Sequence, residues 1–522
     1  MHEGRIGNSV RNFKYGLINT IVISLIPFIT RTVFIHILGK DYLGIDALFL
    51  NIINLLEIVN VGIGSAITYS VYKPIADGDI ARCRSLFRLY KKCYYTMGIC
   101  IFAVGMALTP FLDSLLREKP NIPESIYAIY LIILVGVASG YFFMDKQCVI
   151  TAHQKGYLVS RIKTVVIVCI NAVEIAFLFL TKKYMVYLVI QTSQNLIINL
   201  LIARKARRNY PQYFGGKVEA LIREDKERII KNTTALIFNR AGSLIINCTD
   251  NIVISTFVGV GTVGLYSNYL TLKNMVNTVA SIFTQSLTAS IGNLNASEVD
   301  AEKKRLNEVF NQVYFINFLL YAFCTVCLVC LLEPFIHIWI GDQYIMGLPI
   351  VIIVSANFYF IGLQKTAEQF KAACGLYWQD RFRVFIESLC NIIISIVLVK
   401  RIGVLGVLLG TLVSNLCITF WVEPYIVFKY ALNQKFHIYL LKSIVYSTIV
   451  AAVSFALYNA VMLVFDGYGG IGQFVLRTTM TVTMTAGMLT IIFFRNPYFR
   501  KTLEMGKQYA QSFAQRLQGR VR

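Results

Sequence analysis

Long apolar runs separated by short polar segments make up most of this chain. A helix needs about 20 mostly apolar residues to cross the hydrocarbon core of a bilayer. The pattern predicts fourteen such helices, at 15–38, 43–68, 94–116, 125–144, 164–181, 184–203, 232–258, 263–291, 311–332, 347–370, 384–399, 402–428, 443–465 and 473–494. The longest gaps, near 204–231, 292–310 and 495–522, are too short for a soluble domain. We therefore expect an all-α integral membrane protein of about fourteen transmembrane helices.

The positions of Lys and Arg between these runs predict the orientation. If the N-terminus is cytoplasmic, 38 of the 50 basic residues fall in inner segments and 7 fall in outer loops. Short cytoplasmic loops carry such an excess of positive charge. We expect a multi-pass protein of the cell (inner or plasma) membrane with both termini in the cytoplasm.

Composition supports the membrane class and argues against nucleic acid as a partner. Hydrophobic residues make up 56% of the 522 residues and charged residues 15%, whereas soluble domains are about 25% charged. The net charge of +22 comes from short basic clusters between apolar runs, with no helix that has one basic face. Such clusters suit cytoplasmic loops that face anionic membrane lipid.

The sequence shows no set of residues that suits catalysis, a metal or a cofactor. Most of the twelve cysteines lie inside apolar runs, where a thiol behaves as a small hydrophobic group. Cys324, Cys327 and Cys330 share one apolar helix, but no nearby His or Cys completes a metal site. A polymerase or ligase working at the outer face needs a large outer loop, and the outer loops are short. We predict that the chain is not an enzyme and has no cofactor.

An internal repeat relates the first two predicted helices to the seventh and eighth. Residues 12–70 align without a gap to the stretch 220 positions later, and eleven of the 59 pairs are identical, including Gly39/Gly259 and Gly44/Gly264. Six helices separate the matched segments, so the relation preserves orientation. Parallel repeats of this kind place a substrate site where two helical halves meet. We expect a six-helix bundle at 1–203, a linker at 204–231, a second bundle at 232–430, two further helices at 431–494 and a basic cytoplasmic tail at 495–522.

Polar side chains inside the predicted membrane segments indicate a binding site. Helix 263–291 carries a polar stripe at steps of three and four residues: Ser267, Thr271, Asn274, Thr278, Ser281, Gln285 and Thr288. Lys273 and Asn277 lie beside this stripe. Polar residues at bilayer depth are costly, and in a stripe beside a lysine they suggest a water-filled cavity, although a packed helix interface is the alternative.

Other membrane helices carry further polar and ionisable groups. Helix 232–258 places Arg240, Asn247 and Asn251 on one face, with Asp250 adjacent. The remaining candidates, on other helices, are Arg31, Asp46, Glu57, Asn171, Glu174, Glu368 and Glu387, and we expect Arg477 to anchor at an outer headgroup. Arginine and lysine attract phosphate oxygens, while amides and hydroxyls hydrogen-bond sugar hydroxyls. These residue types suit binding rather than bond cleavage.

The segment from Arg11 to Lys92 resembles a known family of transporters. It contains Arg31-Thr-Val-Phe-Ile, Leu38-Gly-Lys-Asp-Tyr-Leu-Gly-Ile, Gly62-Ile-Gly-Ser-Ala-Ile and Tyr72-Lys-Pro-Ile-Ala-Asp-Gly-Asp. The order is similar to that in bacterial capsule and O-antigen repeat-unit flippases of the multidrug/oligosaccharidyl-lipid/polysaccharide exporter superfamily.

The resemblance implies a transporter that flips an undecaprenyl-diphosphate-linked oligosaccharide outward by alternating access, with a polysaccharide polymerase as a further partner. It places cavity cations at Arg31 and Lys273, and we add Arg240 from its own polar face. With Asn247, Asn251, Asn274, Asn277 and Gln285, these residues form the predicted substrate-binding set. Glu57 occupies a position where some relatives have arginine. In this respect the sequence departs from the full arginine cluster of those relatives.

Two alternatives remain open from the sequence. A cation-coupled exporter of drugs or small molecules, similar to the multidrug and toxic compound extrusion branch, needs acidic coupling residues, for which Glu57, Asp250 and Glu368 are candidates. A membrane glycosyltransferase or ligase needs catalytic carboxylates in a large outer loop. The basic character of the predicted cavity favours the flippase.

Overall fold

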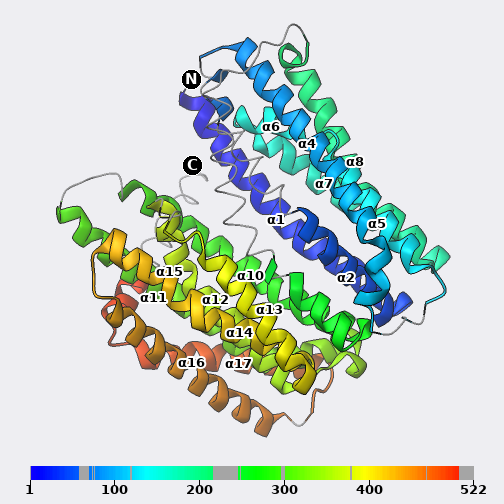
Figure 1. The fold of residues 1–522 in the computed structure, drawn as a ribbon. Coiled ribbons are helices and arrows are strands. Elements are labelled where there is room, and N and C mark those ends of the chain that lie inside the picture. Colours follow the sequence, from blue (N-terminus) through cyan, green and yellow to red (C-terminus); the bar gives the residue numbers. More distant parts are fainter. Residues whose placement is uncertain are drawn as a thin grey trace, which may run out of the picture. The chain divides into compact units, whose positions relative to one another are not determined.

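The computed structural model describes residues 2–57, 70–72, 74–75, 77–117, 120, 122–215, 245–246, 248–294, 300–374, 376, 379–465 and 467–504. Within these residues all regular structure is helical (Figure 1). Backbone groups inside a bilayer must be hydrogen-bonded within the chain, and a helix does this segment by segment. The predicted all-α class is therefore confirmed for the described residues.

Helices cover nearly every apolar run. Their bounds are α1 (His2–Leu38), α2 (Lys40–Leu56), α4 (Ile80–Leu108), α5 (Ile126–Tyr141), α6 (Asp145–Ala152), α7 (Gly156–Thr181), α8 (Tyr184–Asn209), α10 (Val260–Leu294), α11 (Asp300–Ile340), α12 (Leu348–Ala373), α13 (Arg383–Ile402), α14 (Val404–Ser414), α15 (Phe420–Val427), α16 (Phe436–Val464) and α17 (Ile471–Phe493). The predicted helix 232–258 is seen as helical at 248–257. Nine described helices are long and apolar enough to cross a membrane, or ten if α5 and α6 form one span.

Several helices begin well before their apolar runs. α4 begins at Ile80 rather than 94, α7 at Gly156 rather than 164, and α11 at Asp300 rather than 311. An apolar run marks only the part of a helix that lies inside the hydrocarbon core. The polar turns beyond it remain helical because the backbone hydrogen bonds of the helix continue through them. At α4 the Asp79 carboxylate accepts a hydrogen bond from the backbone N–H of Arg82 (2.9 Å), which caps the first turn.

Two predicted helices are interrupted. The run 125–144 ends at Tyr141, and α6 continues at an angle of 41° after a turn in which Phe143 has a φ of +71°. The run 402–428 becomes α14, a π-helical segment at Asn415–Thr419 and α15, with a second π-helical segment at Phe428–Leu432. π-Helical turns inside α-helices are frequent at functional sites.

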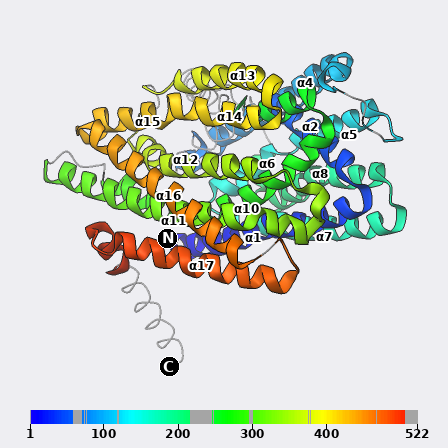
Figure 2. The same cartoon turned by 90° about the horizontal axis from the view of Figure 1, so that it is seen from below.

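The chain divides into two compact units. The first comprises residues 1–267 and 399–404, and the second comprises 268–398 and 405–522. In the first unit α1 lies along α7 (Figure 1), and the hydroxyl of Thr30 donates to the side-chain oxygen of Asn171 (2.7 Å). In the second unit α11 packs against α12, α16 and α17 (Figure 2). The Phe318 ring stacks on Tyr446 at a centroid distance of 4.0 Å.

Candidate functional site

A half-buried arginine on α1 forms the centre of a polar cluster in the first unit. Arg31 donates from its guanidinium to the hydroxyl of Ser267 on α10 (2.6 Å). Ser267 is itself buried and donates to the backbone oxygen of Gly264 (2.7 Å). Arg31, the predicted cavity cation of helix 15–38, is therefore hydrogen-bonded to Ser267, the first residue of the polar stripe predicted for helix 263–291.

Acidic and phenolic groups surround this arginine. Asp46 on α2 and Tyr187 on α8 act electrostatically on Arg31, and Tyr184 donates to the Asp46 carboxylate (3.4 Å). Glu174 on α7 is 3% exposed and acts electrostatically on both Asp46 and Tyr187. Asp46 therefore lies close enough to Arg31 to act on its charge, and Glu174 lies near Asp46 and Tyr187. The sequence suggested Arg31, Asp46 and Glu174 one by one but did not show that they meet, and Tyr184 and Tyr187 were not predicted.

The remaining members of the predicted stripe lie in the second unit. Lys273 is half-buried, Asn274 is exposed, and Asn277 accepts a hydrogen bond from the hydroxyl of Tyr321 (3.3 Å). The hydroxyls of Thr278 and Ser281 donate to carbonyls of their own helix. The side chain of Gln285 lies outside the described residues. The described part of the stripe is therefore partly engaged in local bonds.

The predicted helix 232–258 is described only in its second half. Arg240 and Asn247 lie outside the described residues. Asp250 is 8% exposed and Asn251 is 3% exposed. The side-chain oxygen of Asn251 has no hydrogen-bond partner among the described residues. Buried acceptors of this kind are usually hydrogen-bonded to protein groups or to ordered water.

The other two carboxylates proposed for ion coupling have different surroundings. Glu57, at the end of α2, accepts a hydrogen bond from the Tyr141 hydroxyl (2.9 Å). Glu368 is exposed and pairs with Lys365 three residues earlier on α12 (2.6 Å). An exposed pair of this kind contributes little to stability. Glu57 therefore lies in the first unit with Asp250, whereas Glu368 lies in the second.

A buried charge network in the second unit was not predicted as a site. Lys371 on α12 pairs with Asp380 (2.5 Å) and with Glu423 on α15. Arg383 at the start of α13 pairs with the same Asp380 (2.6 Å) and with Glu387 (3.4 Å). Hydrogen bonds extend the network through the π-helical segment, because Thr419 and Asn415 both donate to Glu387. Two features of the sequence could have indicated this network. Arg383 and Glu387 are four residues apart, which allows them to pair on one helix, and Glu423 lies inside an apolar run.

Arg477 does not lie at a headgroup interface as the sequence suggested. Its side chain is 1% exposed, and its guanidinium donates to the backbone oxygens of Phe465 (3.2 Å) and Gly467 (3.0 Å). Arg477 thus holds the connection between α16 and α17. Proximity to a helix end was a poor guide here because the preceding loop, which connects α16 to α17, contacts the guanidinium.

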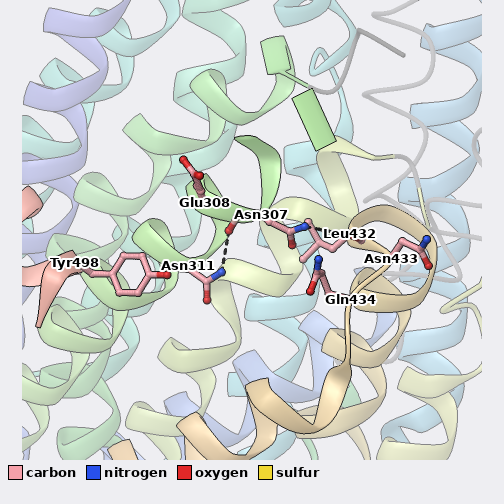
Figure 3. Close-up of a pocket in the computed structure, with 7 residues that line it drawn as sticks. All are labelled: Asn307, Glu308, Asn311, Leu432, Asn433, Gln434 and Tyr498. Atoms are coloured by element: carbon pink, nitrogen blue, oxygen red, sulfur yellow. Dashed lines mark hydrogen bonds between the residues drawn. The ribbon is translucent and has the colours of Figure 1, made fainter. Parts of the chain in front are cut away.

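One polar cavity is described in the second unit, with a volume of about 360 Å³ (Figure 3). It lies between the N-terminal part of α11, the turn before α16 and the segment after α17. Its lining residues are Asn307, Glu308, Asn311, Leu432, Asn433, Gln434 and Tyr498. The side-chain nitrogen of Asn311 donates to the backbone oxygen of Asn307 (2.9 Å), and its oxygen accepts from Lys442 (2.9 Å). None of the sequence-predicted site residues lines it.

Comparison with known proteins assigns the family. The model of the polysaccharide biosynthesis protein family matches residues 9–289, which is more than half of the chain. The chain belongs to this family. The match includes Arg31, Asp46, Glu174 and Ser267, so the cluster of the first unit lies wholly inside the family region. The predicted membership of a polysaccharide biosynthesis family is therefore confirmed.

Relatives share the fold at low sequence identity. An uncharacterized membrane protein of Methanocaldococcus jannaschii is 18% identical over 420 residues, which cover 77% of this chain and 81% of the relative. The structure of a lipid II flippase MurJ in an inward closed conformation matches 94% of this chain and 99% of its own, with a TM-score of 0.63 and 14% identity. The structure of an inward-facing multidrug resistance transporter of the MATE family matches 78% of this chain and 98% of its own, with a TM-score of 0.56 and 12% identity. The two solved structures confirm the predicted all-α membrane fold.

Proposed function

We propose that this transporter flips undecaprenyl-diphosphate-linked oligosaccharide repeat units from the cytoplasmic to the outer leaflet for cell-surface polysaccharide synthesis. The proposed location is the cell membrane, with both termini in the cytoplasm and a polysaccharide polymerase receiving the product. The two predicted bundles, 1–203 and 232–430, are proposed as the parts that rock. Arg31, Arg240 and Lys273 would bind the diphosphate, and the asparagines and Gln285 would contact sugars.

The observation that carries this proposal is the position of Arg31. Its guanidinium is half-buried, inside the family region, and bonded to the first residue of a polar stripe that continues along α10. A guanidinium matches phosphate oxygens in a planar, two-pronged geometry and stays charged at all physiological pH values. Asp46 acts on this charge from α2, and an anionic headgroup would compete with it for the guanidinium.

A cation-coupled exporter of small molecules remains the second candidate. It is favoured by the MATE-family fold likeness and by the buried carboxylates of the first unit, since carboxylates attract cations. Glu57 and Asp250 are the proposed coupling residues, whereas Glu368 already has a lysine partner on the surface. The same residues would serve a flippase if its transport is coupled to an ion.

The two candidates are separated by deleting the gene in its native host. A flippase deletion should remove surface polysaccharide and cause undecaprenyl-diphosphate-linked oligosaccharide to accumulate in the membrane. That accumulated lipid is then extracted, placed in proteoliposomes with the purified protein, and tested for movement between leaflets. Normal surface polysaccharide in the deletion strain, together with greater sensitivity to cationic drugs, would instead support the exporter.

Replacing Lys273 by alanine is expected to lower flipping of the extracted lipid by about tenfold to a hundredfold, because a charge-assisted hydrogen bond contributes about 1.5–3 kcal/mol. Lys273→Arg retains the charge and should retain most activity. Arg88→Ala, which removes an exposed basic residue from α4, is the matched control. If Lys273→Ala flips the lipid at the rate of Arg88→Ala, Lys273 is not part of the binding site.

A further inference from the structure

The polar cavity of about 360 Å³ in the second unit lies at the level where membrane helices leave the bilayer (Figure 3). Its lining residues on α11 lie at the start of the apolar span that begins at Leu306. Leu432 is the last residue of another span, and Tyr498 follows soon after the span that ends at Phe493. All parts of the lining are therefore at the interfacial depth, where lipid headgroups are found.

Hydrogen bonds hold the walls of this cavity in place. A π-helical segment ends at Leu432, and Asn433 follows it with a φ of +50°, a conformation that asparagine adopts more readily than most residues. The backbone oxygen of Leu432 accepts a hydrogen bond from the side chain of Asn307 on α11 (3.4 Å). At the end of the cavity formed by Tyr498 (Figure 3), Gln312 donates to the backbone oxygen of Tyr498 (3.1 Å). The cavity is therefore a bonded part of the fold.

One carboxylate and one ammonium group lie close to the Tyr498 wall of the cavity. Burial raises the pKa of Tyr498, and the negative charge of Glu308 raises it further, so this lining carboxylate is near the phenol. Lys442 on α16 donates to the side-chain oxygen of Asn311 (2.9 Å). Its ammonium nitrogen lies 5.8 Å from the centre of the Tyr498 ring. The cavity thus has groups of both charges within a short distance of each other.

This chemistry suits a ligand that carries a phosphate and a primary ammonium group. The four side-chain amides of the lining provide donors for phosphate oxygens and acceptors for an ammonium group. Lys442 adds a cationic donor for the phosphate, and Glu308 adds an anionic acceptor for the ammonium. Glu308 would repel a ligand with negative charge alone. Phosphate and ammonium occur together, joined by a short ethylene chain, in phosphoethanolamine.

The apolar surface beside the cavity favours a lipid over a soluble ligand. Ile438, Leu441 and Val445 on α16 are exposed, and their spacing of three and four residues places them on one face of the helix. Lys442 follows Leu441 directly and lies four residues after Ile438, so it borders the same face. Acyl chains would lie along this face while the headgroup enters the cavity.

We propose that this cavity binds the headgroup of a phosphatidylethanolamine molecule, with Glu308 at its ammonium group and Lys442 at its phosphate. The bound lipid would join the start of α11, the turn before α16 and the segment after α17 at the membrane surface. The proposal goes beyond the proposed function and does not depend on which substrate is transported.

Lipid selectivity tests the site directly. The purified protein, freed of lipid in detergent, is mixed with phosphatidylethanolamine, phosphatidylcholine or phosphatidylglycerol of the same acyl chains, and bound lipid is measured by mass spectrometry of the intact protein. Phosphatidylethanolamine should bind at least about tenfold more tightly than the other two. The quaternary ammonium of phosphatidylcholine cannot donate hydrogen bonds, and phosphatidylglycerol has no cation for Glu308. Equal binding of the three lipids would overturn the proposal.

Substitutions locate the bound lipid. Glu308→Gln should lower the affinity for phosphatidylethanolamine by about tenfold, without weakening phosphatidylglycerol, because only the partner of the ammonium is lost. Lys442→Met should weaken phosphatidylethanolamine by a similar factor, because the phosphate loses its cation. Asp77→Asn removes an exposed carboxylate from the first unit and, as the matched control, should leave selectivity unchanged. If the preference for phosphatidylethanolamine survives Glu308→Gln, the lipid binds elsewhere and the proposal is wrong.

A headgroup without acyl chains distinguishes a lipid from a soluble ligand. Glycerophosphoethanolamine, added to the lipid-free protein, should compete with phosphatidylethanolamine only at concentrations at least about a hundredfold higher, because it buries no acyl chain against α16. If it competes at equal concentration, the cavity binds a soluble ligand and its assignment to a lipid is wrong.

Discussion

Replacing Lys371 by methionine should lower the free energy of unfolding by about 3–5 kcal/mol, the largest stability loss that we expect from a single substitution in this chain. Lys371 is 4% exposed and pairs with Asp380 and Glu423, both of them buried. Methionine preserves the length of the side chain, so the loss comes from buried carboxylates that lose their cation. Unfolding of the purified protein in detergent, by denaturant titration or heating, measures the difference.

The same helix supplies a control for this prediction. Lys365 also lies on α12 and pairs with a carboxylate three residues later, but that pair is exposed. Lys365→Met should therefore change stability by less than about 1 kcal/mol. Adding Glu423→Gln to Lys371→Met should restore part of the lost stability, because one of the uncompensated carboxylates becomes neutral. Equal stability of Lys371→Met and Lys365→Met would contradict the assignment of Lys371 to a buried network.

The network shows why some of the structure could not be predicted from the sequence. Lys371 and Arg383 counted toward the basic residues of an inner loop, where charged side chains are usually solvated. Their carboxylate partners come from the segment before α13, from α13 and from α15, and only the tertiary structure brings these segments together. Hydropathy locates a helix in the bilayer, but it does not show which charges at a helix end are covered by a neighbour.

The helices were much easier to predict. Each apolar run must be helical because the bilayer offers no partners for its backbone, and the structure shows helix in all fourteen runs over the described residues. The extensions of α4, α7 and α11 were missed because polar turns outside the membrane leave no apolar signal.

The candidate site was predicted by residue type but not by its pairing. Arg31, Asp46 and Glu174 were each noticed as ionisable groups at bilayer depth, yet the expected cationic cavity did not anticipate one carboxylate that acts on the arginine and a second that lies near the first. Sequence spacing cannot align three different helices in depth and rotation. This acidic surrounding provides a way to distinguish substrate binding by Arg31 from a purely structural role.

Replacing Arg31 by alanine should reduce flipping of the extracted lipid by about a hundredfold, because a two-pronged guanidinium–phosphate interaction is lost. It should also lower stability, since the buried Asp46 carboxylate loses the cation that acts on it. Arg31→Lys, which retains charge but not the two-pronged geometry, should regain stability more fully than flipping.

Adding Asp46→Asn to Arg31→Ala separates the two effects. The neutral amide relieves the uncompensated carboxylate, so the double variant should unfold at nearly the denaturant concentration of the parent protein. Its flipping rate should nevertheless stay as low as that of Arg31→Ala, because no guanidinium is available to bind the diphosphate. Binding of the extracted lipid, measured in detergent by its protection against thermal unfolding, should be weakened in parallel. If the double variant regains both stability and flipping, Arg31 acts only by compensating the Asp46 carboxylate, and the diphosphate must be bound elsewhere.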